Sequence, residues 1–365
     1  MNRNSLLIIS LLSLGFSACN TSDPEPSQPY DNGVLILNAG NFLDNNGSIS
    51  LVQRTSTTAS FDIFQKENSR TLAGGLADYT EVNSKGIILV DNSTAGKDII
   101  EIVDARTFKS LSTIPSSDIE NPRVAVKATD TKAYVTCWDA TGDYSNFYKS
   151  PGYVAVIDLT TNKLAKKITV QNGAESITVI GTEAFVGNTG TGTTKITVID
   201  IATDAVKQTI EIGKNPALLG VDANSKLWLY AGGEMVRLNT QTKTVETRFK
   251  ITSPNASKSP SSFTLSADKK TFYFTNSYYD AAADYVQRGE TYSFSVDAAA
   301  VAADKPFINR LFSGGLGVDP QTGTIYAGVV PSFKQAGYVL RYQPNGTLID
   351  SVKAEIAPSK FFFKK

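Results

Sequence analysis

The stretch Val156-Ile157-Asp158-Leu159-Thr160-Thr161-Asn162-Lys163 decides the fold. In it, a short apolar strand pattern ends in an aspartate, a Thr-rich turn follows, and a second strand pattern begins. Residues 102–107 and 198–204 repeat this order, and weaker copies occur in four other places. The equivalent positions are 53, 104, 158, 200, 239, 297 and 343. The unit therefore occurs seven times, at intervals of 39 to 58 residues.

A second pattern accompanies each of these turns. A strand pattern at 121–126 leads through a polar turn to aromatic and β-branched residues at 133–136, and the same order occurs at 215–230 and at 261–276. Such composition and alternation are typical of half-buried strands. No segment from Asn32 onward shows a helical period. Four strands in each unit of about 40 to 50 residues predict a β-propeller.

The two ends of this region complete one another. Residues 357–363 resemble an innermost strand with nothing after it, and residues 33–38 resemble a second strand with nothing before it. Together they supply one blade, which removes free sheet edges. We therefore expect an all-β, seven-bladed propeller with four-stranded antiparallel blades, closed by the N-terminal strands and the C-terminal strand. Two stacked β-sandwiches are the alternative, but they need no complementary half-blades.

The first residues resemble a targeting signal. Arg3 precedes an apolar run from Leu6 to Phe16, which is shorter than the roughly 20 residues of a membrane span. Phe16-Ser17-Ala18-Cys19 resembles a bacterial lipobox, so we predict a signal peptide at 1–18 and acylation of Cys19. The alternative is a plain secretory signal with an incidental cysteine. Residues 19–31 then form a proline-containing tether, and residues 32–365 form a single propeller domain.

The amino-acid composition excludes several classes of function. Lysine plus arginine equals aspartate plus glutamate, 35 against 35, which argues against a nucleic-acid partner. The chain contains no histidine, which excludes Ser-His-Asp hydrolysis, His-ligated metals and a histidine base. Cys137 is the second of two cysteines, and with Cys19 acylated no intrachain disulfide is available. We expect Cys137 to be a small buried residue, and the chain to bind rather than catalyse.

Loops from the second to the third strand of each blade share one face of a propeller with the loops that enter the next blade. Function is often carried by loops on a rigid scaffold, and aromatic side chains supply contact area at low entropy cost. On this face we expect a ligand-binding surface made by the following residues: Asn41, Phe42, Tyr79, Arg123, Trp138, Asp139, Tyr144, Phe147, Tyr148, Glu175, Asn215, Tyr278, Tyr279, Tyr285 and Phe333. Packing of these aromatics against one another, to stiffen long loops, is the alternative. Arg123 and Glu175 form either polar contacts for a ligand or a structural pair.

The residues 133–137 and 274–276 resemble the Tyr-Val-Thr-Asn repeats of YncE-like propellers. The opening at 34–50 is similar to that of Bacteroidetes surface lipoproteins of this class, of which BtuG-like proteins capture cobalamin. The resemblance implies a lipid-anchored outer-membrane protein at the cell surface. It would bind cobalamin or another corrinoid and deliver it to a TonB-dependent transporter. Acidic residues at Asp23 and Glu25 resemble the surface-export signal of that group.

Two alternatives stay open beside this hypothesis. The same face is also suited to a protein partner, as a scaffold, or to a different transported ligand. An enzyme is a third hypothesis, left with only acid–base pairs or tyrosine chemistry. Residues 44–47 hint at a calcium loop, but Thr55 stands where such a loop needs glutamate, so we predict a turn. We expect no catalytic residue, metal or cofactor, and a monomer apart from the transporter.

Overall fold

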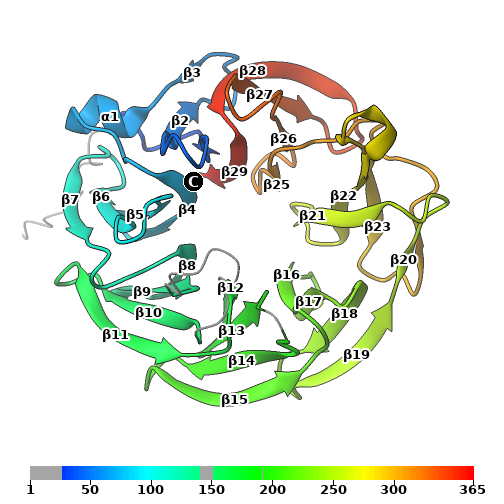
Figure 1. Cartoon of the computed structure of the whole chain (residues 1–365), viewed down its shortest axis with the longest axis horizontal. Helices are drawn as coiled ribbons and strands as arrows, with labels where there is room; N and C mark the ends of the chain where they lie inside the picture. The colour runs from blue at the N-terminus through cyan, green and yellow to red at the C-terminus, as the bar shows by residue number, and fades with distance from the viewer. Residues whose placement is uncertain (1–26, 140–150, 191) are drawn as a thin grey trace, which may run out of the picture.

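The computed structural model describes residues 27–139, 151–190 and 192–365, and these form a ring of seven blades (Figure 1). The strands of each blade, from the axis outward, are as follows. Blade 1 is β29 (Pro358–Phe363), β1 (Val34–Asn38), β2 (Ser48–Val52) and β3 (Ala59–Ser60); blade 2 is β4 (Gly75–Val82), β5 (Lys85–Asp91), β6 (Ile99–Asp104) and β7 (Ser110–Ile114). Blade 3 is β8 (Pro122–Thr129), β9 (Lys132–Cys137), β10 (Tyr153–Asp158) and β11 (Lys163–Thr169); blade 4 is β12 (Ala174–Ile180), β13 (Glu183–Asn188), β14 (Lys195–Asp200) and β15 (Ala205–Glu211). Blade 5 is β16 (Ala217–Val221), β17 (Lys226–Ala231), β18 (Glu234–Asn239) and β19 (Thr244–Phe249); blade 6 is β21 (Ser259–Leu265), β22 (Thr271–Asp280) and β23 (Val286–Ser295); blade 7 is β25 (Leu316–Val318), β26 (Ile325–Val329), β27 (Ala336–Tyr342) and β28 (Leu348–Ile356).

Two short helices and a parallel strand pair complete the elements of the described residues. Helix α1 (Ile63–Asn68) joins blades 1 and 2, and the 3₁₀ helix η1 (Ala281–Ala283) lies at the tip of the β22–β23 hairpin. In the three described ranges, no helix has the length and apolar character to cross a membrane. We call the face at which each innermost strand begins the upper face, and the other face the lower face.

The predicted ring closure is confirmed. β29 pairs antiparallel with β1, with Val34 opposite Phe363 and Ile36 opposite Phe361. Figure 1 shows β29, in red, beside the blue N-terminal strands near the centre of the ring. Strands from the two ends of the chain therefore make one sheet, and β29 covers the inner edge of β1.

The repeated aspartate lies at the turn between the third and fourth strands. The carboxylate of Asp158 accepts hydrogen bonds from the Thr160 N–H (2.8 Å) and from the hydroxyls of Thr160 and Thr161. Asp200 accepts from the N–H and hydroxyl of Thr203 in the same way. These hydrogen bonds lower the pKa of both carboxyls. The motif thus recurs because a short acceptor side chain satisfies the turn's own donors.

Blade 6 departs from the predicted four strands, because its outer strand is reduced to a single bridge. Ile308 pairs with Thr291 of β23, and the neighbouring segment instead forms β24 (Val301–Ala302), which is parallel to β20 (Ile251–Thr252). Proline stands at position 306, and a proline has no N–H to donate to a ladder. The segment after β23 also contains turns and bends, so most of its residues lie outside the sheet.

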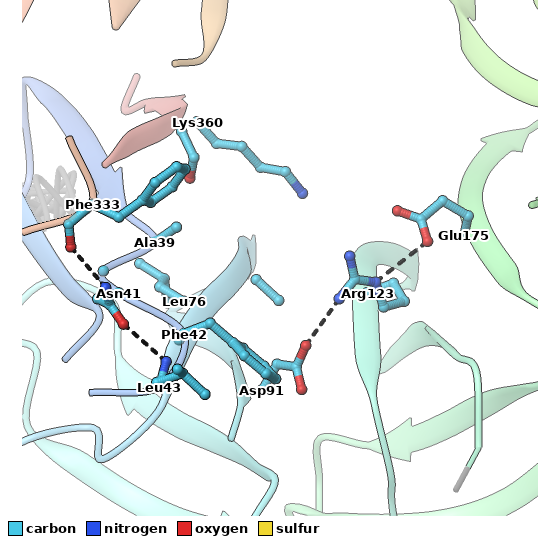
Figure 2. Close-up of a pocket in the computed structure, with 14 residues that line it drawn as sticks. Ala39, Asn41, Phe42, Leu43, Leu76, Asp91, Arg123, Glu175, Phe333 and Lys360 are labelled. Carbon is cyan, nitrogen blue, oxygen red and sulfur yellow. Dashed lines mark hydrogen bonds and ion pairs between the residues drawn. The ribbon is translucent and has the colours of Figure 1, made fainter. Parts of the chain in front are cut away.

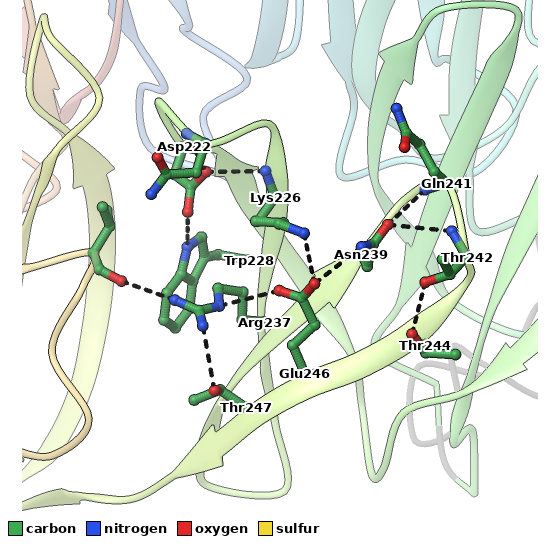
Figure 3. A network of polar contacts seen from close by, with 12 residues as sticks. Asp222, Lys226, Trp228, Arg237, Asn239, Gln241, Thr242, Thr244, Glu246 and Thr247 are labelled. Atoms are coloured by element: carbon green, nitrogen blue, oxygen red, sulfur yellow. Dashed lines mark hydrogen bonds and ion pairs between the residues drawn. The ribbon is translucent and has the colours of Figure 1, made fainter.

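Most of the core lies between adjacent blades, and blade 5 shows how polar groups enter it. The Trp228 indole is fully buried and donates to the buried carboxylate of Asp222 at 2.8 Å. Figure 3 shows Arg237 beside this ring, with Glu246 on its other side at 3.5 Å. Arg237 also donates to the Val296 carbonyl of blade 6 at 3.4 Å, so the network joins two blades.

A second kind of contact repeats between blades on the lower face. Lys85 of blade 2 donates to the Leu159 carbonyl and to Asn162 in the turn of blade 3. Lys132 of blade 3 donates to the Ile201 carbonyl and to Asp204 in the turn of blade 4. In blade 4 the polarity is reversed, because Glu183 takes the lysine's place and accepts from Lys243 in the turn of blade 5. We call these contacts the inter-blade staples.

This reversal predicts a rescue experiment. Glu183→Lys alone places a cation against Lys243 and Lys207, and we expect it to lower the free energy of unfolding by about 2 kcal/mol. Adding Lys243→Asp recreates the lysine–aspartate staple of Lys132 and Asp204, so the double variant should regain most of that loss. Urea unfolding of the four proteins measures the coupling. Strictly additive losses would show that the staple contributes nothing.

The segment 28–31 is fastened to the lower face of blade 2. Tyr30 is buried, its ring lies 5.3 Å from that of Phe108, and its hydroxyl donates to Glu67 at 2.6 Å. Asp31 accepts two bonds from the Arg106 guanidinium, at 2.9 and 3.1 Å. Tyr30 and Asp31, which the sequence assigns to the tether, therefore pack on the folded domain.

Candidate functional site

A cavity of about 630 Å³ opens on the upper face between blades 1, 2, 3, 4 and 7 (Figure 2). One wall is apolar and is made by Phe42, Leu43, Leu76 and Phe333. The opposite wall carries the charged groups of Asp91, Arg123 and Glu175, and Lys360 enters from the innermost strand β29. Small residues line the cavity between the two walls: Ala39, Gly40, Gly75, Ala77 and Ser359.

The apolar wall is positioned by the side chain of Asn41. Its amide nitrogen donates to the Phe333 carbonyl of blade 7 at 3.0 Å, and its oxygen accepts from the Leu43 N–H at 3.0 Å. Asn41 thus joins the β1–β2 loop to the β26–β27 loop. The two aromatic rings on these loops stay exposed, at 48% for Phe42 and 60% for Phe333. Large apolar side chains held open to solvent by a rigid loop are typical of a recognition surface.

The charged wall is centred on Arg123. Its guanidinium lies 3.0 Å from Asp91 and 3.3 Å from Glu175. It also stacks on the Trp138 ring, 4.0 Å from the ring centroid, while the Trp138 indole N–H donates to Glu175 at 2.7 Å. Burial raises the pKa of Asp91 despite the cation beside it. The four side chains therefore form one interlocked group, which fixes the orientation of two carboxylates and of the Trp138 ring.

Lys360 adds a second cation near the axis. Its Nζ lies 3.1 Å from Asp78, whose other oxygen accepts from the Ala125 N–H at 3.0 Å. This wall therefore has two carboxylates, Asp91 and Glu175, and two cations, with the Asp78 carboxylate behind Lys360 and outside the cavity lining. Within the described ranges, no group of three or more His, Cys, Asp or Glu residues is arranged to hold a metal ion. The geometry suits hydrogen bonding to a large polar ligand rather than binding of a small anion.

The structure brings together five of the predicted site residues in the cavity: Asn41, Phe42, Arg123, Glu175 and Phe333. Trp138 adjoins them, and Asp139 follows it with a left-handed backbone (φ 72°). Tyr278, Tyr279 and Tyr285 lie apart from this cavity, on the β22–β23 hairpin of blade 6, where Tyr279 and Tyr285 are 66% and 69% exposed. Tyr144, Phe147, Tyr148 and Cys19 lie outside the described residues.

Two further predicted residues, Tyr79 and Asn215, do not line the cavity. Tyr79 is buried in the core between blades 1 and 2, stacks on Phe108 at 5.8 Å, and donates its hydroxyl to Glu81 at 2.7 Å. It stands well inside β4 rather than at its start, and a register shift between Leu76 and Asp78 precedes it. Burial raises the pKa of its hydroxyl well above the ordinary value.

Asn215 stands just before β16 and therefore lies on the upper face, but outside the cavity. It adopts a left-handed backbone (φ 51°), and its N–H donates to the Thr193 carbonyl at 3.0 Å. It therefore shapes the turn between blades 4 and 5 and does not line the cavity. Asparagine is favoured in such turns because its side chain tolerates the left-handed region.

Besides the small lining residues, sequence reasoning missed four larger ones: Leu43, Leu76, Asp91 and Lys360. Asp91 ends the second strand of blade 2, the position that Asn38 and Asn188 hold in other blades, so the repeat itself carried a signal. Lys360 belongs to the strand that was predicted to be innermost, and a lysine there points to the axis. Leu43 and Leu76 carried no such signal. Cys137 is fully buried, as expected.

Comparisons with known proteins agree with this architecture. A quinonprotein alcohol dehydrogenase-like protein from Bacteroides thetaiotaomicron has a TM-score of 0.63 at 16% identity, over 92% of this chain and 79% of that one. A putative 6-phosphogluconolactonase from Bacteroides uniformis has a TM-score of 0.61 at 13% identity, over 91% and 99%. At these identities the likeness concerns the fold alone. No curated protein sequence matches significantly, whereas a family model described as a domain of unknown function matches residues 32–364.

Proposed function

The chain belongs to the DUF5074 family, and we propose that it captures a bulky amphipathic nutrient, a corrinoid in the first place, in the cavity of its upper face. The observation that carries the proposal is the pairing of an exposed apolar wall with an ordered charged wall. A corrin ring has broad apolar faces and an edge of amide groups. Phe42 and Phe333 suit the faces, and Asp91 and Glu175 suit the amide N–H groups.

The size of the cavity supports this class of ligand. Its volume of about 630 Å³ lies within the roughly 300 to 1,000 Å³ of small-molecule sites, and it is open to solvent on one side. A ligand larger than the cavity would extend from its open side over the upper face. The hypothesis that delivery goes to a TonB-dependent transporter, from an acylated Cys19 at the outer membrane, rests on the YncE-like resemblance.

Calorimetric titration with cyanocobalamin tests the proposal. We expect purified protein carrying Cys19→Ser to bind, and Phe42→Ala and Phe333→Ala each to weaken the affinity about tenfold or more, since exposed aromatic anchors dominate such surfaces. Leu111→Ala is the matched control, because Leu111 is 48% exposed on β7 and lies outside the cavity. Folded protein that gives no heat with cyanocobalamin or with its corrinoid precursors would refute corrinoid capture.

A protein partner is the second candidate, and the blade 6 hairpin favours it. Tyr279, Tyr285 and Val286 are exposed at its tip, away from the cavity. If this hairpin grips a transporter, Tyr279→Ala/Tyr285→Ala should abolish recovery of the transporter from outer membranes without added ligand. The same double variant should leave calorimetric binding of a small ligand unchanged.

A further inference from the structure

Asp98 joins two sides of the charged wall through its carboxyl group. It stands just before β6 and is 1% exposed. One of its oxygens accepts from the Asn92 N–H at 2.6 Å, and the other accepts from the Asn121 N–H at 2.7 Å. Asn92 directly follows Asp91, and Asn121 comes two residues before Arg123. The distance between these two segments, and hence the Asp91–Arg123 pair, depends on this carboxyl.

The same segment also holds the apolar wall. The Ser93 N–H donates to the Asn45 side chain at 2.8 Å, and the Asn45 amide donates back to the Ser93 hydroxyl at 2.8 Å. Asn45 belongs to the β1–β2 loop that carries Phe42. In addition, the Asn92 amide donates to the Ala73 carbonyl at 2.6 Å, just before β4. Asp98 is therefore linked through hydrogen bonds to both walls of the cavity.

A second carboxyl contacts Asp98. The Glu120 carboxyl lies beside it, because the Gly96 N–H, two residues before Asp98, donates to Glu120 at 3.0 Å, while the Asn121 N–H, next to Glu120, donates to Asp98. Glu120 also accepts from the Ser116 hydroxyl at 2.6 Å. Two carboxyls in such contact need one proton between them. Burial, and then the hydrogen bond with Glu120, raises the pKa of Asp98 to about 8. Although burial opposes it, the hydrogen bonds from Asp98 and Ser116 lower the pKa of Glu120.

The other ionisable groups around this pair are also defined. Asp91 faces it from β5, Cys137 from β9 and Tyr153 from β10, whose hydroxyl accepts from the Glu120 N–H at 2.9 Å. Lys167 of β11 lies 4.4 Å from the Tyr153 ring centroid and is the cation that acts on Glu120, and Asp139 acts on Cys137 and Tyr153. Asp91 disfavours ionisation of Asp98, while burial keeps the Cys137 and Tyr153 protons in place at neutral pH.

We propose that Asp98 and Glu120 share a proton that positions both walls of the cavity, and that loss of this proton to solvent loosens the site and weakens ligand binding. Deprotonation leaves two carboxylates in contact, and their repulsion drives segment 92–98 away from segment 116–121. Asp98 is thus a positioning residue. The ligand part of the inference rests on the proposed function, whereas the structural part does not.

Trp138 reports the change without any ligand. The chain has two tryptophans, so subtracting the emission of Trp138→Phe from that of the wild type isolates Trp138 beside Arg123 and Glu175. We expect this difference to change in a single transition near pH 8. Asp98→Asn should remove the transition. Glu120→Gln should move it to lower pH, because Asp98 then loses the carboxylate that retains its proton.

Controls separate this switch from general unfolding. Glu234→Gln changes a carboxylate of blade 5 that pairs with Arg248, far from the pair, and should leave the transition in place. Because the folded chain holds the Asp98 proton more tightly than an unfolded one, the free energy of unfolding should fall as pH rises toward about 8. Asp98→Asn should flatten that slope. A Trp138 transition that is unchanged in both Asp98→Asn and Glu120→Gln would overturn the proposal.

The ligand arm is read separately. If cyanocobalamin binds, its dissociation constant should rise about tenfold or more between pH 7 and pH 9 in the wild type. In Asp98→Asn and in Glu120→Gln, the dissociation constant should change little over the same pH range. A pH-independent dissociation constant beside a clear Trp138 transition would overturn the coupling to binding. If cyanocobalamin does not bind at any pH, the proposed ligand is wrong, and the Trp138 transition alone decides the role of Asp98.

Discussion

A chain that ends at Ala357 should not fold into a stable monomeric ring. Removing residues 358–365 deletes β29, which covers the inner edge of β1 over the whole length of that strand. It also removes Phe361 and Phe363, which pack around Tyr326, and Phe362, which packs on Tyr79 at 4.9 Å. Phe361, Phe362 and Phe363 are partly buried. A fully buried phenylalanine contributes about 3 to 5 kcal/mol, so three partly buried ones and the lost β1–β29 hydrogen bonds together outweigh the about 5 to 15 kcal/mol by which a domain is stable. The deletion therefore exceeds the stability available.

Size-exclusion chromatography and circular dichroism at room temperature measure this result. We expect aggregated or unfolded protein, since an exposed β1 edge pairs readily with other chains. Deletion of Lys365 alone is the matched control, because that residue is exposed whereas Lys364 is buried and donates to the Ala105 carbonyl at 2.6 Å. A monomeric, cooperatively melting chain without β29 would mean that the ring does not need its closure.

Gly315→Ala should be the most damaging single substitution of a small residue at the closure. A Cβ at Gly315 would stand 2.0 Å from the Ser359 carbonyl oxygen, and the Gly315 N–H already donates to the Pro358 carbonyl at 3.0 Å. A Cβ added at Gly314 or at Gly328 would likewise stand 2.3 Å from the Pro358 carbonyl oxygen. These glycines form a slot for the start of β29, so an added methyl must push the backbone aside. We expect a loss of about 3 kcal/mol, at the upper end for overpacking.

Thermal and urea unfolding of Gly315→Ala measure that loss. Gly181→Ala is the informative control, because a Cβ there meets nothing within 4 Å and the only penalty is a left-handed backbone at φ 61°. That penalty is about 1 to 2 kcal/mol. A loss at Gly315 that is no larger than the loss at Gly181 would show that the slot is loose enough to admit a methyl group.

The sequence was sufficient for the number of blades and for the closure, because both rest on local patterns. The turn at Asp158 repeats since its carboxylate satisfies nearby donors, and such a contact spans only a few residues. Tyr79 shows the limit. A register shift in β4 decides which neighbour a side chain meets, and no local pattern marks the shift. Asp91 and Arg123 are 32 residues apart, and only the ring brings them together. The staples of Lys85 and Lys132 were missed for the same reason.

The fastening of residues 28–31 gives the ring a defined path for mechanical load. A pull on the N-terminal end of the chain meets the two-pronged Asp31–Arg106 contact and the buried Tyr30 ring first. Force is therefore received at the lower face of blade 2, before it can reach β1. The β1–β29 pairing comes later along the chain and bears no load while the Asp31–Arg106 contact and the buried Tyr30 ring hold. A pull at the N-terminal end would therefore load these contacts before it could open the β1–β29 pairing that closes the ring.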